Sequence, residues 1–316
     1  MNISVIATVK NEGDALRPLL DSLLAQTLPP DEVVICDGGS SDHTLAVLAE
    51  YEDQLPLRVL AVPGSNISTG RNRAIAAAAG PIIAVTDAGV VLHPVWLAAI
   101  TQPLSEGQAS VASGWFEPDP HTDFEVVLGA TVLPALDDID PEKFLPSSRS
   151  VAFLKCAWEA VGGYPEWLDY GEDLVFDFAL REQHGPFPFV PAAVAYFRPR
   201  RTLRAFFRQY YLYARGDGKA NLWPRRHAIR YLTYLVGLPV IFRLLWRDRW
   251  LGWLLLLGGG GAYCARPGQR LWGATRGWGP WPRLRAFSLI AIIRLVGDVA
   301  KMVGYPAGVW WRWRQR

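Results

Sequence analysis

The chain has 316 residues, half of them hydrophobic, with 32 Lys and Arg against 30 Asp and Glu. This composition excludes a disordered, collagen-like or disulfide-framework protein, and the length allows one large domain or two ordinary ones. The charge is unevenly distributed: residues 1–197 carry 9 basic and 27 acidic side chains, a net of −18, whereas residues 198–316 carry 23 basic and 3 acidic ones, a net of +20. Ten of the 14 Trp also lie in the second part. We therefore expect two parts suited to two different environments.

Strand and helix patterns alternate over the first hundred residues. Apolar runs rich in β-branched residues predict strands, and Leu or Ala at helical spacing predicts the helices between them. This alternation predicts an α/β fold with a mostly parallel sheet and helices on both faces, in which ligands bind beyond the carboxyl ends of the strands. The expected strands are Ile3–Val9, Glu32–Cys36, Leu57–Val62 and Pro81–Thr86, and the expected helices are Asp14–Gln26, His43–Tyr51 and Gly70–Ala79.

Residues 101–197 are less regular. The acidic, proline-containing stretch 134–146 predicts a surface loop. Beyond it we expect a strand at Ser150–Leu154, a short helix at Cys156–Val161, a helix at Leu174–Gln183 and a strand at Val190–Phe197.

The basic part begins at residue 198 and opens with an amphipathic helix, roughly Leu203–Ala214. A clean membrane span needs ~20 mostly apolar residues, and each of the apolar stretches that follow is interrupted by charged residues or glycines. Trp and Arg at their ends are typical of interfacial or shallow membrane helices. We predict contact with anionic membrane lipids, through short spans or through helices in the interface. A soluble helical subdomain with a basic face is the alternative. The apolar stretches are Ile229–Trp246, Trp250–Cys264 and Phe287–Trp311.

Acidic residues beyond the predicted strands are the first candidates for chemistry. Asp37 opens a Gly- and Ser-rich turn, where its carboxylate could bond a base or a ribose hydroxyl, although an ordinary Asx turn is an equal alternative. Asp87 could hold a divalent cation that neutralises a diphosphate, or could simply end a strand. The pair Glu172-Asp173 at a helix N-terminus suits a general base and equally suits helix capping.

Several polar and basic residues are candidates for phosphate contacts. Arg71, near the start of the third predicted helix, could meet a phosphate or lie in solvent. Gln209 in the amphipathic helix and Arg215 just after it lie six residues apart and could reach a diphosphate beside a membrane. Arg215 could instead bind lipid headgroups, and Gln209 could simply belong to a polar helix face. The sequence has no G-x-G-x-x-G, Walker A or G-x-S-x-G pattern, and its five His lack metal-ligand spacing. We expect no nucleic-acid partner.

The order and spacing of these motifs resemble family 2 glycosyltransferases of the GT-A fold. The resemblance covers about residues 1–220, and its continuation into a basic helix and a hydrophobic tail is similar to membrane-bound members that build exopolysaccharides or glycolipids. The matching segments are Val9-Lys10-Asn11-Glu12, Cys36-Asp37-Gly38-Gly39-Ser40-Ser41-Asp42-His43-Thr44, Gly70-Arg71-Asn72-Arg73-Ala74-Ile75, Val85-Thr86-Asp87-Ala88-Gly89, Gly162-Gly163-Tyr164-Pro165 and Gly171-Glu172-Asp173-Leu174.

The resemblance implies a GT-A catalytic domain at residues 1–220 and a membrane-associated helical region at residues 221–316, with the catalytic domain on the cytoplasmic side of the inner membrane. It also implies a nucleotide-sugar donor and a glycan or lipid-linked acceptor. By position, Glu12 and Asp37 would contact the nucleoside, and Arg71, Gln209 and Arg215 would lie near the nucleotide or diphosphate.

The remaining implied roles concern the reaction itself. Asp87 would act at the diphosphate or at a Mg²⁺ or Mn²⁺ ion, and Asp173 would deprotonate the acceptor hydroxyl for an inverting displacement. Glu172 and Trp167 would line the acceptor side. An alcohol is a poor nucleophile, so a positioned carboxylate helps it attack, while a cation stabilises the departing diphosphate.

The sequence departs from the family pattern at two places. Gly89 stands where the family's Asp-x-Asp motif has its second carboxylate, which leaves open a non-catalytic scaffold that binds a nucleotide sugar or glycan. The processive members' Gln-x-x-Arg-Trp sequence is replaced by Gln209 and Arg215 at a wider spacing. This second departure favours a transferase that adds one sugar per encounter.

Overall fold

The structure is a computed structural model that describes residues 1–315; Arg316, the last residue of the predicted C-terminal region, lies outside the described residues. The chain divides into two compact units, which we call the sheet unit (Met1–Asp119 with Leu136–Arg198) and the helical unit (Pro120–Ala135 with Pro199–Arg316). The division after Arg198 coincides with the change in the sign of the charge. The predicted domain boundary at 220/221 coincides instead with the end of a helix, α8 (Leu203–Ala220).

The sheet unit is built on one eight-stranded, mostly parallel sheet in the order β3-β2-β1-β4-β7-β6-β8-β5. The first four strands of this order are parallel to one another, which confirms the pattern expected from the first hundred residues. Antiparallel pairs join β7 to β4 and to β6, and β5 to β8. The strands are β1 (Ile3–Val9), β2 (Glu32–Asp37), β3 (Leu57–Ala61), β4 (Ile82–Val85), β5 (Val90–Leu92), β6 (Val111–Pro118), β7 (Val151–Leu154) and β8 (Phe189–Phe197).

Helices cover both faces of this sheet, as predicted. Alternate residues of β1 explain why: Val5 and Ala7 are buried in one apolar cluster, whereas Ile6 is buried in the other. One face is covered by the 3₁₀ helix Gly13–Leu16, α1 (Arg17–Leu24), α2 (Thr44–Ala49) and α4 (Trp96–Ser105); the other by α3 (Ile67–Ala77), α6 (Lys155–Ala160) and α7 (Glu172–His184). Strands β5 and β6 and helix α4 were not predicted.

The helical unit packs α8 closely against the long helix α12. Gly304 and Gly308 of α12 face the backbone of Tyr211 and Arg215, so that a side chain at either glycine would overlap α8. This close contact places α8 in the helical unit. The unit also has a core of its own, made of apolar side chains from four of its helices. Its helices are α5 (Asp123–Val132), α8, α9 (Pro224–Leu232), a π-helical turn (Thr233–Gly237), α10 (Leu238–Arg247), α11 (Arg249–Ala274) and α12 (Pro280–Arg314).

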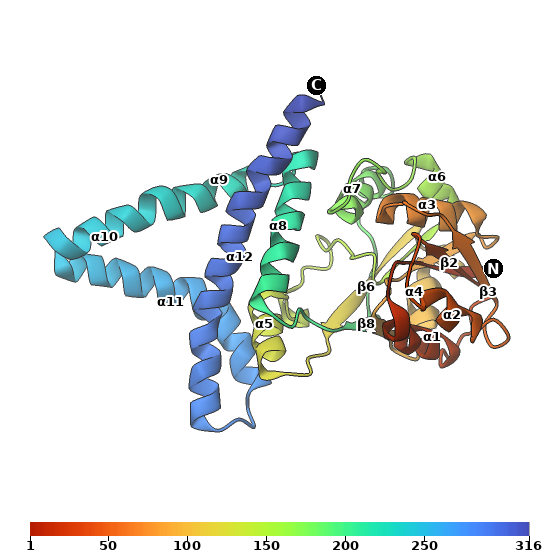
Figure 1. Ribbon diagram of the computed structural model, residues 1–316, viewed down its shortest axis with the longest axis horizontal. Helices are drawn as coiled ribbons and strands as arrows, with labels where there is room; N and C mark the ends of the chain where they lie inside the picture. Colours follow the sequence, from red (N-terminus) through yellow and green to blue (C-terminus); the bar gives the residue numbers. More distant parts are fainter. Residues whose placement is uncertain (316) are drawn as a thin grey trace. The chain divides into compact units, whose positions relative to one another are not determined.

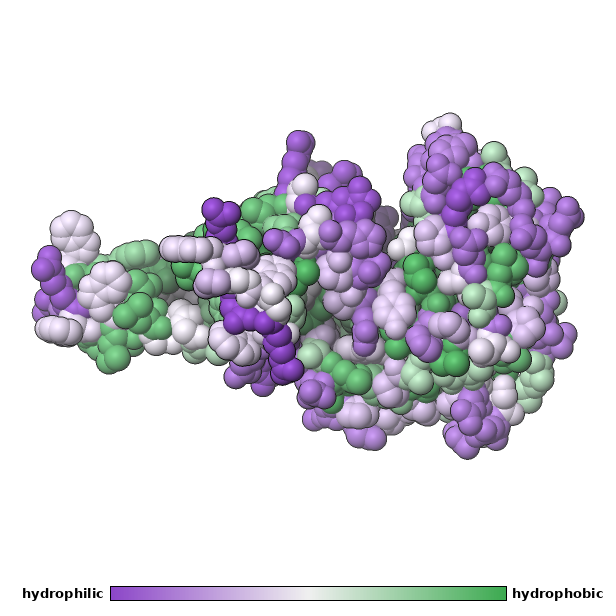
Figure 2. Space-filling model, turned by 90° about the horizontal axis from the view of Figure 1, so that it is seen from below, coloured by the Kyte–Doolittle hydropathy of each residue, from purple (hydrophilic) through white to green (hydrophobic). Residues whose placement is uncertain are grey.

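Helices α10 and α11 form a hairpin (Figure 1), and many of its large apolar side chains are exposed. We call residues 229–257 the apolar arm. Hydrophobic residues gather along it (Figure 2), and Trp246 and Trp250 at its tip are 91% and 89% exposed. Within the described part of the chain, one helical segment, Pro224–Arg247, has the length and apolar composition needed to cross a membrane.

Candidate active site

Hydrogen bonds tie together the loops that follow β1 and β2. The Asn11 side chain accepts a hydrogen bond from the Ser41 backbone N–H at 2.8 Å, with Asn11 itself in the left-handed conformation, which Asn tolerates better than most residues. The backbone N–H of Glu12 donates to Thr44 Oγ1 at 2.9 Å. The structure therefore brings the loops that carry Glu12 and Asp37, the predicted nucleoside residues, next to each other.

Asp37 ends β2 and is almost completely buried. Its carboxylate accepts hydrogen bonds from the backbone N–H of Gly39 at 3.1 Å and of Ser40 at 3.0 Å, and from Ser40 Oγ at 2.5 Å. The Asx turn that the sequence allowed is therefore present. Contact between Asp37 and a nucleoside stays a prediction.

Arg71 is the centre of a buried charged cluster. Its Nη2 donates to Asp87 Oδ1 at 2.6 Å and its Nη1 donates to Glu172 Oε1 at 2.8 Å, while its guanidinium lies over the Tyr164 ring at 5.2 Å. Arg71 is only 2% exposed, so the alternative of a solvated helix turn is wrong. Although burial lowers the pKa of Arg71, Asp87 and Glu172 raise it above its ordinary value. Three predicted site residues thus meet at one place.

The local sequence explains how Arg71 reaches this position. Helix α3 begins at Ile67, earlier than predicted, because Asn66 caps it and accepts the Thr69 N–H at 2.8 Å. Arg71 therefore lies within the helix and points into the sheet unit. Asp87 follows β4, where the carboxyl ends of the parallel strands lie.

Arg149 is a further member of the cluster, and the sequence did not single it out. Its Nε lies 3.8 Å from Asp87 Oδ2, and its guanidinium stacks over the Phe197 ring at 4.6 Å. The sheet register explains the contact: β4 and β7 are antiparallel with Val85 opposite Val151, so residue 149 lies opposite residue 87 just beyond the strand ends. Asp87 is thus flanked by two guanidinium groups.

Glu172 and Asp173 occupy the first turn of α7, which begins after Gly171 in the left-handed conformation. Burial and the neighbouring Asp173 carboxylate, opposed by Arg71, together raise the pKa of Glu172 to about 7. Burial also raises the pKa of Asp173, again opposed by Arg71. A raised pKa makes Asp173 a stronger base, and the helix N-terminus favours its ionised form.

Asp177, one helical turn after Asp173, is a second residue that sequence reasoning missed. It is buried, and its Oδ2 has no hydrogen-bond partner among residues 1–315. Burial raises its pKa well above the ordinary value, and the charges of Asp173 and Glu172 raise it further while Arg71 opposes them. Its position four residues after Asp173 in a helix was the available signal.

The loop before α7 is held by Asn72 of α3. The Asn72 side chain accepts the Tyr164 N–H and donates to the Tyr164 carbonyl oxygen, both at 2.9 Å. Trp167, in the same loop, is 48% exposed. An exposed indole is suited to stacking on a sugar ring, and the acceptor role of Trp167 stays a prediction.

Gln209 and Arg215 lie in α8, which belongs to the helical unit. The Gln209 side chain donates to the Tyr213 hydroxyl at 2.8 Å. The proposed contact of these two residues with a diphosphate stays a prediction.

Asp87 was predicted to bind Mg²⁺ or Mn²⁺, and the surrounding residues test that prediction. Both of its oxygens face guanidinium groups, and Gly89 supplies no second carboxylate. Across residues 1–315 no group of three or more His, Cys, Asp or Glu could hold a metal ion. Mg²⁺ requires octahedral oxygen coordination, so these residues do not fit a site built from side chains alone. Metal dependence stays a prediction.

Comparisons with known proteins agree with the fold. The family model "Glycosyl transferase family 2" matches residues 4–140. The chain is 31% identical to the uncharacterized glycosyltransferase YibD of Escherichia coli over 111 residues, which are 35% of this chain and 32% of that protein. It is 31% identical to validoxylamine A glucosyltransferase of Streptomyces hygroscopicus over 102 residues, 31% of this chain and 22% of that protein. The chain thus matches a third or less of the length of these curated relatives.

Among solved structures, the chain resembles S. aureus TarS 1-349 in complex with UDP-GlcNAc, with a TM-score of 0.54 and 18% identity, covering all of this chain and 92% of that one. At this identity the likeness concerns the fold. The sheet order and the carboxylates at its carboxyl edge define an α/β protein of the GT-A type. Residues 4–140 are thus similar to glycosyl transferase family 2, and the fold is of the GT-A type.

Proposed function

We propose that this protein is a membrane-associated, inverting glycosyltransferase. It moves a sugar from a nucleotide-sugar donor to a hydroxyl group of a lipid-linked or polysaccharide acceptor. One observation carries the proposal: Arg71 bonds both Asp87, beyond β4, and Glu172, in the first turn of α7. The predicted donor side and the predicted acceptor side are thereby joined by one buried guanidinium.

The reaction follows from the chemistry of the side chains at this cluster. Asp173 accepts the proton of the acceptor hydroxyl as its oxygen forms a bond to the anomeric carbon. The bond from that carbon to the diphosphate oxygen breaks, and the nucleoside diphosphate leaves with the electron pair. A single displacement of this kind inverts the anomeric configuration. Arg71 and Arg149 supply positive charge beside Asp87, where charge on the departing diphosphate would be stabilised.

The proposed membrane association rests on the helical unit. Its net charge is strongly positive, since residues 199–316 carry 22 basic and 3 acidic side chains and residues 120–135 add two acidic ones, a net of +17. Its apolar arm exposes Trp246 and Trp250 beside Arg247 and Arg249. Tryptophan and arginine together are typical of the boundary between lipid tails and headgroups. Each Lys or Arg near an anionic surface adds about 1 kcal/mol of attraction. We propose the cytoplasmic face of the inner membrane as the location.

A donor screen with a base variant tests the proposed reaction. The purified protein is given a panel of nucleotide sugars and candidate acceptors, with Mg²⁺, with Mn²⁺ or with a chelator, and release of the nucleoside diphosphate is measured. Asp173→Asn should lower acceptor-dependent release by about 10²- to 10⁴-fold while donor binding persists. Asp123→Asn, which changes an exposed acid in the first turn of α5, is the matched control and should keep activity. Wild-type turnover in Asp173→Asn would refute the assigned base.

Acceptor dependence separates this function from the alternative of a non-catalytic scaffold. A transferase releases diphosphate in proportion to transferred sugar, whereas a scaffold binds the nucleotide sugar without releasing it. Donor binding without any acceptor-dependent release across the panel would favour the scaffold.

A further inference from the structure

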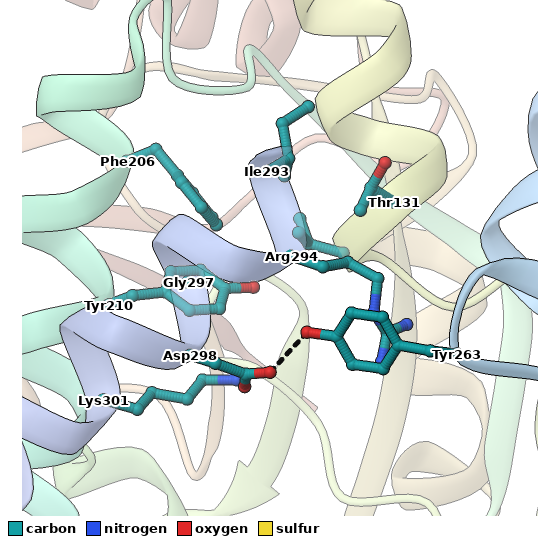
Figure 3. Close-up of a pocket in the computed structure, with 10 residues that line it drawn as sticks. Thr131, Phe206, Tyr210, Tyr263, Ile293, Arg294, Gly297, Asp298 and Lys301 are labelled. Atoms are coloured by element: carbon teal, nitrogen blue, oxygen red, sulfur yellow. Dashed lines mark hydrogen bonds between the residues drawn. The ribbon is translucent and has the colours of Figure 1, made fainter. Parts of the chain in front are cut away.

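The helical unit contains a cavity of about 140 Å³ between α5, α8, α11 and α12. Because a water molecule takes about 30 Å³ of liquid volume, the cavity has room for several waters or for one small polar group. Its walls combine aromatic rings with an unusual number of charged side chains. Figure 3 shows Tyr263, Arg294, Asp298 and Lys301 converging on it from α11 and α12.

Asp298 is the single carboxylate at this cavity, and its oxygens are already used. Oδ1 accepts from Arg230 Nε at 2.7 Å, and Oδ2 accepts from the hydroxyls of Tyr234, at 3.0 Å, and Tyr263. Burial alone would raise the pKa of Asp298, but the hydrogen bonds from Tyr263 and Arg230 lower it below the ordinary value. Asp298 therefore stays ionised and supplies one negative charge.

Two further cations face the cavity without a carboxylate of their own. The Arg294 guanidinium lies 3.7 Å from the centre of the Tyr263 ring, and its Nε is buried without a hydrogen-bond partner among residues 1–315. Lys301 Nζ lies 4.7 Å from the centre of the Tyr210 ring. No carboxylate in the described part of the chain lies within ion-pair distance of Lys301.

The charges at the cavity therefore do not balance. Arg230, Arg294 and Lys301 carry three positive charges, against the negative charges of Asp298 and of Asp217, which also acts on Lys301 and is hydrogen-bonded to His227 at 3.0 Å. Burial and repulsion from Arg230, opposed by Asp298 and Asp217, together lower the pKa of Lys301 to about 8. Burying a charge is costly unless it is paired, so this surplus would be stabilised by an anion in the cavity.

We propose that this cavity binds the phosphate group of a membrane lipid, with Lys301 and Arg294 as its donors. A phosphate ester carries one or two negative charges, which match the surplus, and its oxygens accept hydrogen bonds from both side chains. The lipid origin follows from the surroundings, since the same unit carries the exposed apolar arm and the strongly basic surface. Free inorganic phosphate is the other source of the same chemistry, and it differs from the lipid in having no acyl chains. This proposal concerns the helical unit and does not depend on glycosyl transfer.

Binding of short-chain phosphatidic acid tests the site. The full chain is held in an uncharged sugar detergent and titrated with dihexanoyl phosphatidic acid, with dihexanoylglycerol, which lacks the phosphate, and with inorganic phosphate, which lacks the acyl chains. Phosphatidic acid should bind saturably and at least tenfold more tightly than either of the other compounds. Equal affinity for inorganic phosphate would overturn the lipid source, and equal affinity for dihexanoylglycerol would overturn the phosphate site.

Substitutions then locate the bound phosphate. Lys301→Met keeps the length of the side chain without its charge and should weaken phosphatidic acid binding at least tenfold. Arg285→Gln, which removes an exposed charge on the same helix, is the control and should change binding less than threefold. Wild-type affinity in Lys301→Met, or an equal loss in Arg285→Gln, would refute the assignment.

A measurement on the unaltered protein covers the case in which Lys301→Met does not fold. Amine acetylation is followed by mass spectrometry, with the 80%-exposed Lys143 side chain as an internal reference. Phosphatidic acid should slow acetylation of Lys301 at least fivefold relative to Lys143. Unchanged relative rates at saturating phosphatidic acid would overturn the proposal independently of any variant.

Discussion

Replacing Glu172 by Gln should remove a pH-dependent loss of stability from the sheet unit. Glu172 is 6% exposed, and burial raises its pKa from an ordinary 4.5 to about 7. An acid whose pKa is raised by folding stabilises the protein fully below the unfolded-state pKa, and that stability is lost as the pH rises through the folded-state value. At about 1.4 kcal/mol per pH unit, we expect the wild type to lose about 2 kcal/mol from this group between pH 5 and 7.

Gln keeps the size of the side chain and can still accept the hydrogen bond from Arg71, but it has no charge to titrate. At pH 5 Glu172 is mostly protonated, so Gln replaces a neutral group there, and only toward pH 7 does the variant lack a charge that the wild type carries; the informative quantity is therefore the change with pH. Ionised Glu172 also raises the pKa of Asp177, and a neutral Gln relieves that effect in the same direction. Both contributions increase the stability of the variant relative to the wild type as the pH rises.

Native-state hydrogen exchange in increasing urea measures this difference, read on peptides from β1 and β4 so that the helical unit does not contribute. The free energy of opening of Glu172→Gln, relative to wild type, should become more favourable by about 2 kcal/mol from pH 5 to 7. Glu52→Gln, which changes an exposed acid in the same unit, should show a change within about 0.5 kcal/mol. A flat difference for Glu172→Gln over this range would refute the buried titration.

The remaining predictions concern the helical unit. Gly308→Ala should destabilise the packing of α8 on α12 by about 1–3 kcal/mol, because the new Cβ would overlap the Arg215 carbonyl oxygen. The control Gly258→Ala in α11 meets open space and should stabilise its helix by about 0.5–1 kcal/mol. Thermal unfolding of both variants checks this, and equal shifts in melting temperature would contradict the packing. If the apolar arm inserts into the bilayer, alkaline carbonate should leave the protein in the membrane pellet and detergent should release it. Trp246→Ser with Trp250→Ser should increase the carbonate-released fraction, and full release of the wild type would limit the contact to the surface.

The parallel half of the sheet was predictable because its signals are local. Strands such as Ile3–Val9 are continuous apolar runs, and the acidic residues that follow them lie at one edge for any parallel arrangement. Strand β7 was expected, but its antiparallel pairing with β4 was not, since the sequence of a four-residue strand does not show which strand it pairs with. Arg149 was missed for that reason: only the register of β7 on β4 places it opposite Asp87.

The burial of Arg71 could not be predicted from the sequence either. Its helix was predicted, yet whether an Arg in a helix is solvated or buried depends on partners 16 and 101 residues away in the sequence. Helical spacing alone did put Glu172 and Asp173 at one helix end. What it could not show is that burial changes the pKa values of those two carboxyls in the presence of Arg71.

The charges of the cluster suggest why so many acids are kept beside a site for an anionic donor. If Asp87, Glu172, Asp173 and Asp177 were all ionised, two guanidinium groups would leave a net charge of −2, which would repel a diphosphate. The raised pKa values of Glu172 and Asp177 reduce that charge, because burial favours the protonated form of both carboxyls. Burial also raises the pKa of Asp173, but this carboxyl is partly accessible at the N-terminus of α7, which favours its ionised form and suits its proposed role as the base. Burial thus lowers the negative charge of the cluster, and Arg71 links Glu172 to Asp87 within it.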